Sequence, residues 1–327
     1  MNKETFLVAP LNWGLGHASR CIPLINNLLT DNKNVIIASD GIALDLLRQE
    51  FPKLPFVNLP SYNIKYGKRN SQILAMLMSL PKIITAILRE HRLLKDITLQ
   101  YKINTVISDN RFGMWNKKIH SIYLTHQLMI KAPKGLKFLE PIMWYVHRLI
   151  INRYDECYIP DFEGDNNLSG DLSHKYTLPK NAKFINPLSR FSSLDVDCLI
   201  SKKNNYDIVI IISGPEPQRS IFEKNMLIRF AHSTEKILIL QGLPSNFQAT
   251  LNSKNDNITI LPHLDTNSLA ACLINAKKII CRSGYSTIMD LHALNCLHKA
   301  EFIPTPGQTE QEYLAEYHKK LPQRENN

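Results

Sequence analysis

Short apolar strands alternate with amphipathic helical stretches along this chain of 327 residues, and the alternation runs once before residue 186 and again after residue 205. Strands that are separated by helices form parallel sheets within α/β layers, so the pattern argues against an all-helical or an all-β fold. The predicted strands are Phe6–Ala9, Val35–Ser39, Phe56–Leu59, Thr105–Ser108, Ser121–Leu124, Glu156–Ile159, Ile208–Ile212, Lys236–Leu240, Ile258–Leu261, Lys278–Cys281 and Glu301–Ile303.

The alternation stops at Asn186–Asn205, which has no apolar periodicity, contains Pro187 and ends in a polar run. We place the domain boundary there, with one domain over residues 1–190 and a second over residues 191–327. The predicted architecture is two Rossmann-like α/β domains that face a cleft. Pro23 interrupts the apolar face of the first helix, so we expect that helix to start late or to have a loose first turn.

The net charge of +10 lies entirely in the first half of the chain. Residues 1–190 hold 25 Lys and Arg against 15 Asp and Glu, whereas residues 191–327 hold 14 of each. A basic face attracts an anionic membrane, an anionic acceptor or nucleic acid. No aromatic or helix-turn-helix reading motif supports nucleic acid, so we expect none as a partner.

Two segments, Ile73–Leu88 and Leu136–Ile151, are unusually apolar but fall short of the ~20 residues of a membrane span. We expect core or domain-face helices, with a helix lying on the bilayer surface as the alternative. No signal peptide is recognisable, and the cysteines form no C-x-x-C pair. We therefore expect a cytoplasmic protein with reduced thiols, in peripheral contact with the inner face of the membrane.

A strand–turn–helix segment near residue 284 predicts an anion site. The strand Lys278–Cys281 runs into a small-residue turn at Gly284, and a helix is expected from Ser286 or Thr287. Unpaired N–H groups and the dipole at a helix start bind phosphate. Asp290, one turn into the helix, is placed to accept ribose hydroxyls, although an ordinary strand–turn–helix connection explains the same residues.

Two further segments follow strands of the second half. Ser213-Gly214 forms a second small-residue turn, and two such turns on one sheet could hold a diphosphate. The polar side chains of Pro304–Gln311 suit hydrogen bonds to sugar hydroxyls.

The first strand leads into a loop with Gly14 and Gly16 that ends at His17. His17 is the first candidate base or diphosphate contact, and Arg20 could hold an anion. Asp109, directly after another strand, is the second candidate base, and His126 has the same kind of position; for both, a loop-capping role is the alternative.

The same loop admits a different interpretation. Gly14-x-Gly16-x-x-Ser19, with Asp40 at the end of the second strand, mimics a dinucleotide fingerprint, but Ser replaces the third small residue.

The order of these motifs resembles that of two-domain GT-B glycosyltransferases, especially the family 28-like group with the N-acetylglucosaminyltransferase of the peptidoglycan lipid intermediate. Gly14-Leu-Gly16-His17 matches a Gly-rich loop that ends in His. Residues 282–290 match Arg-Ser/Ala-Gly-x-x-Thr-x-x-Glu, with Asp290 in place of Glu. Pro304–Gln311 matches a Pro-rich loop followed by Gln.

The resemblance implies a role for each matched residue. The diphosphate would be held by the turns at residues 213–214 and 283–284, and the donor ribose by Asp290. The nucleobase of the donor would lie in a pocket at residues 261–264. The implied donor-site residues are Gly14, Gly16, Ser213, Gly214, His263, Leu264, Arg282, Ser283, Gly284, Ser286, Thr287, Asp290, Gln308, Gln311 and Glu312, with Gln311 and Glu312 on the donor sugar. Members of the group usually continue into further helices, so we expect a C-terminal domain that is truncated at its end.

Together these features imply an inverting hexosyltransferase. It would move a sugar from a nucleotide diphosphate-sugar, a UDP-sugar by resemblance, to the hydroxyl of an unidentified, lipid-linked acceptor. No Asp-x-Asp triplet stands at a strand end, so we expect neither a metal nor another cofactor. A nucleotide-sugar hydrolase or epimerase on the same fold is one alternative, and a non-catalytic nucleotide-sugar-binding protein is another.

Overall fold

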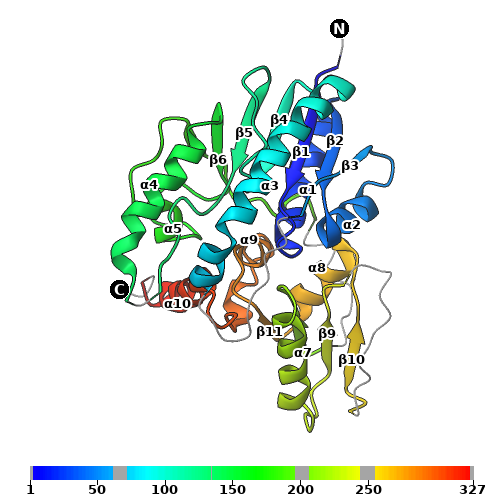
Figure 1. Ribbon diagram of the computed structural model, residues 1–327. Helices are drawn as coiled ribbons and strands as arrows, with labels where there is room; N and C mark the ends of the chain where they lie inside the picture. Colours follow the sequence, from blue (N-terminus) through cyan, green and yellow to red (C-terminus); the bar gives the residue numbers. More distant parts are fainter. Residues whose placement is uncertain (1–2, 62–71, 134, 196–205, 244–254, 325–327) are drawn as a thin grey trace.

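The structure is a computed structural model that describes residues 3–61, 72–133, 135–195, 206–243 and 255–324. Its strands form two sheets in which neighbouring strands run parallel (Figure 1). The larger sheet has the order β3-β2-β1-β4-β5-β6-β7, and the smaller has the order β10-β9-β8-β11-β12. The prediction of two Rossmann-like α/β units is therefore confirmed.

The larger sheet contains β1 (Thr5–Pro10), β2 (Asn34–Ser39), β3 (Phe56–Asn58), β4 (Thr105–Asp109), β5 (His120–Leu124), β6 (Glu156–Ile159) and β7 (Ala182–Phe184). The helices along this part of the chain are α1 (Gly16–Thr30), α2 (Gly41–Glu50), α3 (Gln72–Tyr101), η1 (Lys137–Leu139), α4 (Glu140–Ile151) and α5 (Asp171–His174). The second part contains β8 (Ile208–Ile211), α7 (Gln218–Arg229), β9 (Ile237–Leu240), β10 (Ile258–Leu261), α8 (Thr266–Asn275), β11 (Lys278–Cys281), α9 (Tyr285–Ala293), η2 (Leu297–Lys299), β12 (Ala300–Phe302) and α10 (Thr309–Arg324).

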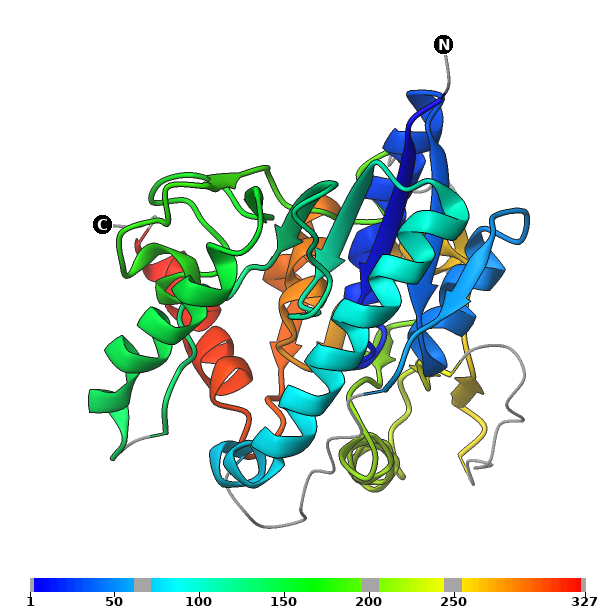
Figure 2. The same ribbon diagram turned by 45° about the horizontal axis from the view of Figure 1, so that its top comes forward.

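Helices cover both faces of the larger sheet because successive residues of a strand face opposite sides. Val8 of β1 packs in the cluster formed with α1 and α2, whereas Leu7 packs with Leu94 and Ile97 of α3. Figure 2 shows α3, in cyan, lying along one face of the sheet. Since β1 pairs with β4, their carboxyl ends lie side by side, and both carry candidate site residues.

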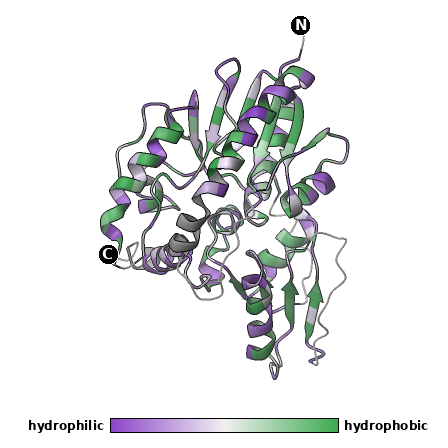
Figure 3. Cartoon of the chain, in the orientation of Figure 1, coloured by the Kyte–Doolittle hydropathy of each residue, from purple (hydrophilic) through white to green (hydrophobic). Residues whose placement is uncertain are grey.

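The smaller sheet repeats this layering around β8. Val209 packs with residues of α8 and α9 on one face, and Ile208 packs with Phe222 and Met226 of α7 on the other. Hydrophobic residues accordingly run along the strands of both sheets (Figure 3). Among the helices that the structure describes, none is long and apolar enough to cross a membrane.

Helix α10 belongs to the second part of the chain but packs against the first. Leu314 of α10 joins Leu168 and Leu172 in an apolar cluster that also contains Ile288 of α9. In Figure 1, α9 lies between the two sheets, and α10 lies below α5. The two parts of the chain therefore share a buried contact, which borders the candidate site described below.

Three local predictions need correction. Helix α1 begins at Gly16 and continues through Pro23, so the expectation of a late start is wrong. Only the carbonyl of Ser19, four residues earlier, loses its usual donor to the proline. The sequence pattern also misses β7, because this three-residue edge strand is too short to show alternation.

The third correction concerns Leu136–Ile151, which forms η1 and α4 on the surface rather than a core helix. Its inward face carries Glu140 and His147, which hydrogen-bond Lys175 and Tyr123, and Ile151 at its end is buried, whereas six other apolar side chains of the segment are exposed. The exposed apolar side chains, called here the α4 stripe, are Leu136, Phe138, Ile142, Tyr145, Val146 and Leu149.

Candidate active site between the two sheets

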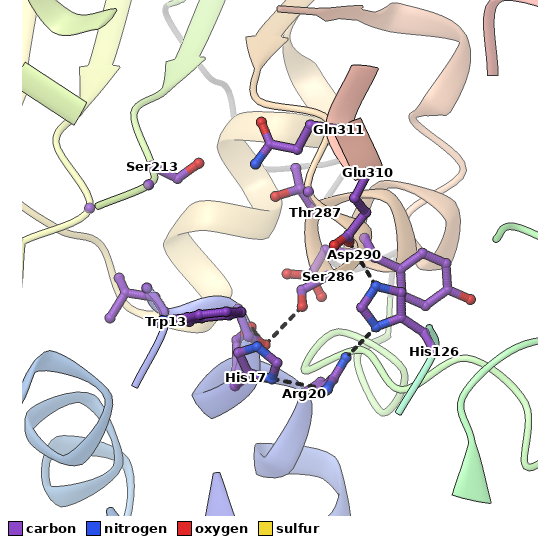
Figure 4. Close-up of a pocket in the computed structure, with 18 of the residues that line it drawn as sticks. Trp13, His17, Arg20, His126, Ser213, Ser286, Thr287, Asp290, Glu310 and Gln311 are labelled. Atoms are coloured by element: carbon purple, nitrogen blue, oxygen red, sulfur yellow. Dashed lines mark hydrogen bonds and ion pairs between the residues drawn. The ribbon is translucent and has the colours of Figure 1, made fainter. Parts of the chain in front are cut away.

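The loops at the carboxyl ends of both sheets line one cavity of about 360 Å³. Side chains enter it from α1, from the loop after β8, and from α9 and α10 (Figure 4). Open α/β sheets bind ligands at this edge, and a cavity of this size accommodates a small organic ligand. The predicted site residues that line it are Gly14, Gly16, His17, Ser213, Gly214, His263, Leu264, Gly284, Ser286, Thr287, Asp290, Gln308 and Gln311.

His17, in the first turn of α1, contacts Asp109, the last residue of β4. The Nδ1 atom of His17 lies 2.9 Å from Oδ1 of Asp109. The imidazole is 12% exposed and borders the cavity, while the carboxylate is fully buried behind it. Among the described residues no hydrogen bond reaches the Nε2 atom of His17, which leaves this nitrogen available to a ligand.

Arg20, one turn further along α1, is buried against the same carboxylate. Its Nε atom donates to Oδ2 of Asp109 at 2.6 Å, and its Nη2 atom donates to Oδ1. Burial alone raises the pKa of Asp109, but the charge of Arg20 and hydrogen bonds from Arg20 and His17 hold that pKa well below its usual value. The geometry suits an ionised Asp109 that orients His17.

His126, after β5, connects this cluster to the second part of the chain. Its Nδ1 atom accepts from Nη1 of Arg20 at 2.9 Å, because a guanidinium only donates. Its proton then lies on Nε2, which donates to Oε1 of Glu310 at 2.8 Å. Burial lowers the pKa of His126 despite the opposing charge of Glu310, which agrees with a neutral ring.

The N-terminal ends of α1 and α9 touch each other. The hydroxyl of Ser286 donates to the carbonyl oxygen of Gly16 at 2.8 Å, and a Cβ atom on Gly16 would lie 2.8 Å from that hydroxyl oxygen. The missing side chain of Gly16 therefore serves the contact between the helices. Gly14, in contrast, has a φ of 81° and open space beside it.

Within the part of the chain that the structure describes, no side chain caps the first turn of α9. The first N–H groups of a helix lack intrahelical acceptors, and the helix dipole adds positive potential there. A Cβ atom on Gly284 would meet only Thr287 Oγ1, at 3.9 Å, so the approach is open. In the turn after β8, Gly214 has a φ of 108° and open space beside it as well. Both predicted anion-binding turns thus border the same cavity.

Asp290 borders the cavity with 14% of its side chain exposed. Its Oδ1 atom accepts from the hydroxyl of Ser189 at 2.6 Å, and its Oδ2 atom lies 3.8 Å from Nε of Arg190. Burial raises the pKa of Asp290, while the charge of Arg190 opposes the rise. The carboxylate therefore keeps acceptor capacity on Oδ2 beside a cation.

Arg282 does not line the cavity. It is buried, donates to the carbonyls of residues 303 and 304 at 3.1 and 2.9 Å, and lies 4.0 Å from the ring centroid of Phe222. Burial lowers the pKa of Arg282 to about 10. Its contacts fix the loop after β12 rather than reach a ligand.

Ser283 and Glu312 also lie outside the cavity wall. Ser283 is fully buried and donates to the backbone oxygen of Gln311 at 2.7 Å. Glu312 is exposed and accepts from the backbone N–H of Gly307 at 3.1 Å. Gln311, whose Oε1 atom accepts from the backbone N–H of Thr305 at 2.8 Å, keeps its amide NH₂ for the cavity.

Several cavity residues are absent from the predicted set, among them Trp13, Tyr285 and Glu310. Trp13 and Tyr285 stand next to glycines that the sequence does single out, and Glu310 adjoins Gln311. Position beside a motif is the only signal for them. Nothing in the sequence pairs Glu310 with His126, which lies 184 residues away.

The dinucleotide interpretation requires Asp40 to be free for a ribose. Instead, Arg111 pairs with Oδ1 of Asp40, and Asn12 donates to Oδ2 at 3.1 Å. The carboxylate is thus already engaged by protein groups, which disfavours that interpretation. Over the described ranges, no group of three or more His, Cys, Asp or Glu side chains is arranged to hold a metal ion.

Comparison with solved structures identifies the fold. The glycosyltransferase SsfS6 from Streptomyces sp. SF2575, complexed with thymidine diphosphate, aligns with a TM-score of 0.57 at 11% identity over 96% of this chain and 86% of that one. The spinosyn rhamnosyltransferase SpnG gives 0.57 at 14% identity over 96% and 90%. A UDP-glucosyltransferase from Polygonum tinctorium gives 0.56 at 12% identity over 96% and 83%.

The chain therefore has the GT-B fold of these glycosyltransferases. No protein-family profile and no curated protein sequence matches it.

Proposed function

We propose that the chain is an inverting glycosyltransferase that moves a sugar from a nucleotide diphosphate-sugar to an acceptor hydroxyl. One observation carries the proposal: a single cavity joins the N-terminus of α9 to the Nε2 atom of His17, and among the described residues no side chain caps that helix and no hydrogen bond reaches that nitrogen. The helix start suits a diphosphate, and the imidazole suits a general base. The shared fold supports the same activity, and a UDP-sugar is the donor that the sequence resemblance implies.

The donor would bind along the second part of the chain. The diphosphate would accept hydrogen bonds from backbone N–H groups at Ser286, Thr287 and Gly214. A ribose hydroxyl would donate to Oδ2 of Asp290 while Ser189 keeps Oδ1. Four further cavity residues would hold the two ends of the donor. Gln308 and Gln311 would contact the sugar, and His263 and Leu264 would contact the nucleobase.

The acceptor would be activated by His17. Nε2 takes the proton of the acceptor hydroxyl while the acceptor oxygen attacks the anomeric carbon. The bond from that carbon to the diphosphate oxygen breaks, and the nucleoside diphosphate leaves with the electron pair. Asp109 holds the imidazole and stabilises the positive charge that develops on it.

Backbone N–H groups and the α9 dipole would stabilise the leaving diphosphate. We therefore propose that transfer requires neither a metal ion nor another cofactor. Chelation by EDTA is expected to leave the rate of transfer unchanged. A rate that falls on chelation and returns with Mg²⁺ contradicts the proposal that no metal ion is required.

The α4 stripe supports a lipid-linked acceptor and peripheral contact with an anionic membrane on the cytoplasmic side. Phe138, Ile142, Tyr145 and Leu149 recur at helical spacing and are between 49% and 69% exposed. Lys137 is exposed beside them, within the half of the chain that holds the whole net charge of +10. An apolar stripe flanked by cations suits an anionic bilayer surface.

The test incubates the full chain with UDP-, GDP- and dTDP-sugars, with and without a total lipid extract as acceptor, and measures released nucleoside diphosphate and labelled lipid. Acceptor-dependent release with labelling of the lipid is expected. Acceptor-independent release of free sugar supports the hydrolase, and sugar isomerisation supports the epimerase. Binding without turnover supports the non-catalytic alternative.

A further inference from the structure

His126 is the side chain through which the second part of the chain reaches the His17–Asp109 pair. It is 6% exposed, and both ring nitrogens and one ring face are occupied. Nδ1 is held by Arg20 of α1, and Nε2 by Glu310 of α10. The ring stacks on Tyr285 of α9, with centroids 4.2 Å apart and planes 4° apart.

Arg20 transmits this constraint to His17. The guanidinium is planar and its donors have fixed directions, so holding Nη1 at His126 also fixes Nη2. Nη2 lies 2.9 Å from Nδ1 of His17, and Oδ1 of Asp109 lies 2.9 Å from the same nitrogen. Figure 4 shows the connected side chains from His17 through Arg20 and His126 to Glu310.

Two tautomers of His17 therefore compete. If Nδ1–H donates to Asp109, Nε2 presents a lone pair to the cavity and can accept a proton. If Nδ1 accepts from Arg20, Nε2 carries the hydrogen and presents a donor instead. The position of the Arg20 guanidinium decides between these states, and Asp109 and His126 hold that position together.

Glu310 is present at this point only while α10 lies on the first part of the chain. Its neighbour Thr309 donates to the backbone oxygen of Lys131 at 2.6 Å, and His318, further along α10, donates to the backbone oxygen of Leu168 at 2.9 Å. These contacts place the start of α10 against His126. If α10 moves away, the Nε2–H group of His126 loses its acceptor.

We infer that Glu310 and His126 are positioning residues that make the tautomer of His17 depend on the docking of α10. Contact between the two parts of the chain and the orientation of the imidazole then form one coupled equilibrium. The description of His17 as a base rests on the proposed function, but the coupling between its tautomer and Glu310 does not.

The test is ¹⁵N NMR of the histidine rings in the full chain, because ring ¹⁵N shifts report the tautomer without any substrate. Signals are assigned from His17→Gln and His126→Gln spectra. Glu310→Ala removes both the hydrogen bond and the charge, whereas Glu310→Gln keeps an acceptor and removes only the charge. Glu316→Ala, on an exposed part of α10 where Glu316 pairs with Lys320, is the control.

Glu310→Ala should shift the ring signals of both His126 and His17, and Glu310→Gln should leave those of His17 near their wild-type positions. Glu316→Ala should move neither. An unchanged His17 in Glu310→Ala, with His126 shifted, overturns the inference. Equal shifts of His17 in both Glu310 variants also overturn it, since charge alone then acts on His17.

If the protein transfers sugar, the coupling has a kinetic signature as well. Glu310→Ala should lower kcat by on the order of 10²-fold, the effect of a misaligned catalytic group, with little change in the donor KM. Glu310→Gln should restore most of that loss. An inactive wild type refutes the proposed function but leaves the NMR test of the coupling intact.

Discussion

Replacing Asp109 by Asn should destabilise the protein strongly, because Arg20 then lacks its counter-ion. The two side chains are 0% and 1% exposed, so solvent cannot compensate the uncovered charge. Breaking a buried ion pair by removing one partner costs about 3–5 kcal/mol. Since whole domains are stable by only about 5–15 kcal/mol, the variant should unfold at a visibly lower urea concentration.

The matched control is Glu301→Gln. Glu301 pairs with Arg229, and hydrogen bonds from it lower the pKa of Glu301 to about 2. About a third of both side chains is exposed, however, so water screens the pair and the expected loss is about 1 kcal/mol or less. Equal losses in the two variants would refute the claim that burial makes the Arg20–Asp109 pair important.

The pH dependence of the unfolding free energy tests the role of the Arg20–Asp109 pair in a second way. The pKa of folded Asp109 lies below its ordinary value of 3.8, so the pair stabilises the fold fully above pH 3.8 and loses that effect as the pH falls further. The stability difference between wild type and Asp109→Asn should therefore shrink below pH 4. A difference that stays constant between pH 7 and pH 3 contradicts the assignment of the ionised state.

Three further predictions follow from the site and the surface. His17→Ala should lower kcat by about 10²–10⁴-fold while nucleotide affinity changes little, and a native rate would return His17 to a structural role. Asp290→Ala should weaken donor binding about 10- to 150-fold, the equivalent of one charged hydrogen bond of about 1.5–3 kcal/mol, and an unchanged Kd in calorimetry would remove Asp290 from the site. The double variant Tyr145→Ser with Leu149→Ser should reduce flotation with anionic vesicles, and about 0.5 M salt should release the wild type from them. The control Ile228→Ser, at a position on α7 that is 66% exposed, should bind like wild type. Equal binding of the wild type to neutral and anionic vesicles would refute the charge argument.

The sheets could be predicted from the sequence because buried parallel strands are nearly continuous apolar runs. Ile258–Leu261 and Lys278–Cys281 match β10 and β11 residue for residue. The short edge strand β7 could not be found, since Ala182–Phe184 has neither length nor alternation. The expected burial of Leu136–Ile151 is wrong for a different reason. An apolar pattern does not distinguish side chains that pack inside the chain from side chains that are exposed at its surface.

The cavity residues could be predicted only where backbone geometry shows in the sequence. Gly14, Gly214 and Gly284 mark turns at strand ends, and each borders the cavity. Arg282 and Ser283 belong to the same motif, yet they bind backbone oxygens behind the cavity, because a motif does not show which way a side chain points.

The relay from Glu310 to His17 could not be predicted at all. His126 and Glu310 are 184 residues apart in the chain, and their contact depends on where α10 packs in the folded protein. Local periodicity carries no information on contacts of that kind.

Calorimetric titration of the wild-type chain with UDP, GDP, ADP and dTDP, without added metal, tests most directly whether the start of α9 is a diphosphate site. At least one nucleoside diphosphate should bind with one site per chain. Thr287→Tyr, which would fill the open approach to the first turn of α9, should abolish that binding without unfolding the protein. No binding by any of the four, or equal binding by wild type and Thr287→Tyr, would contradict a diphosphate site at the start of α9.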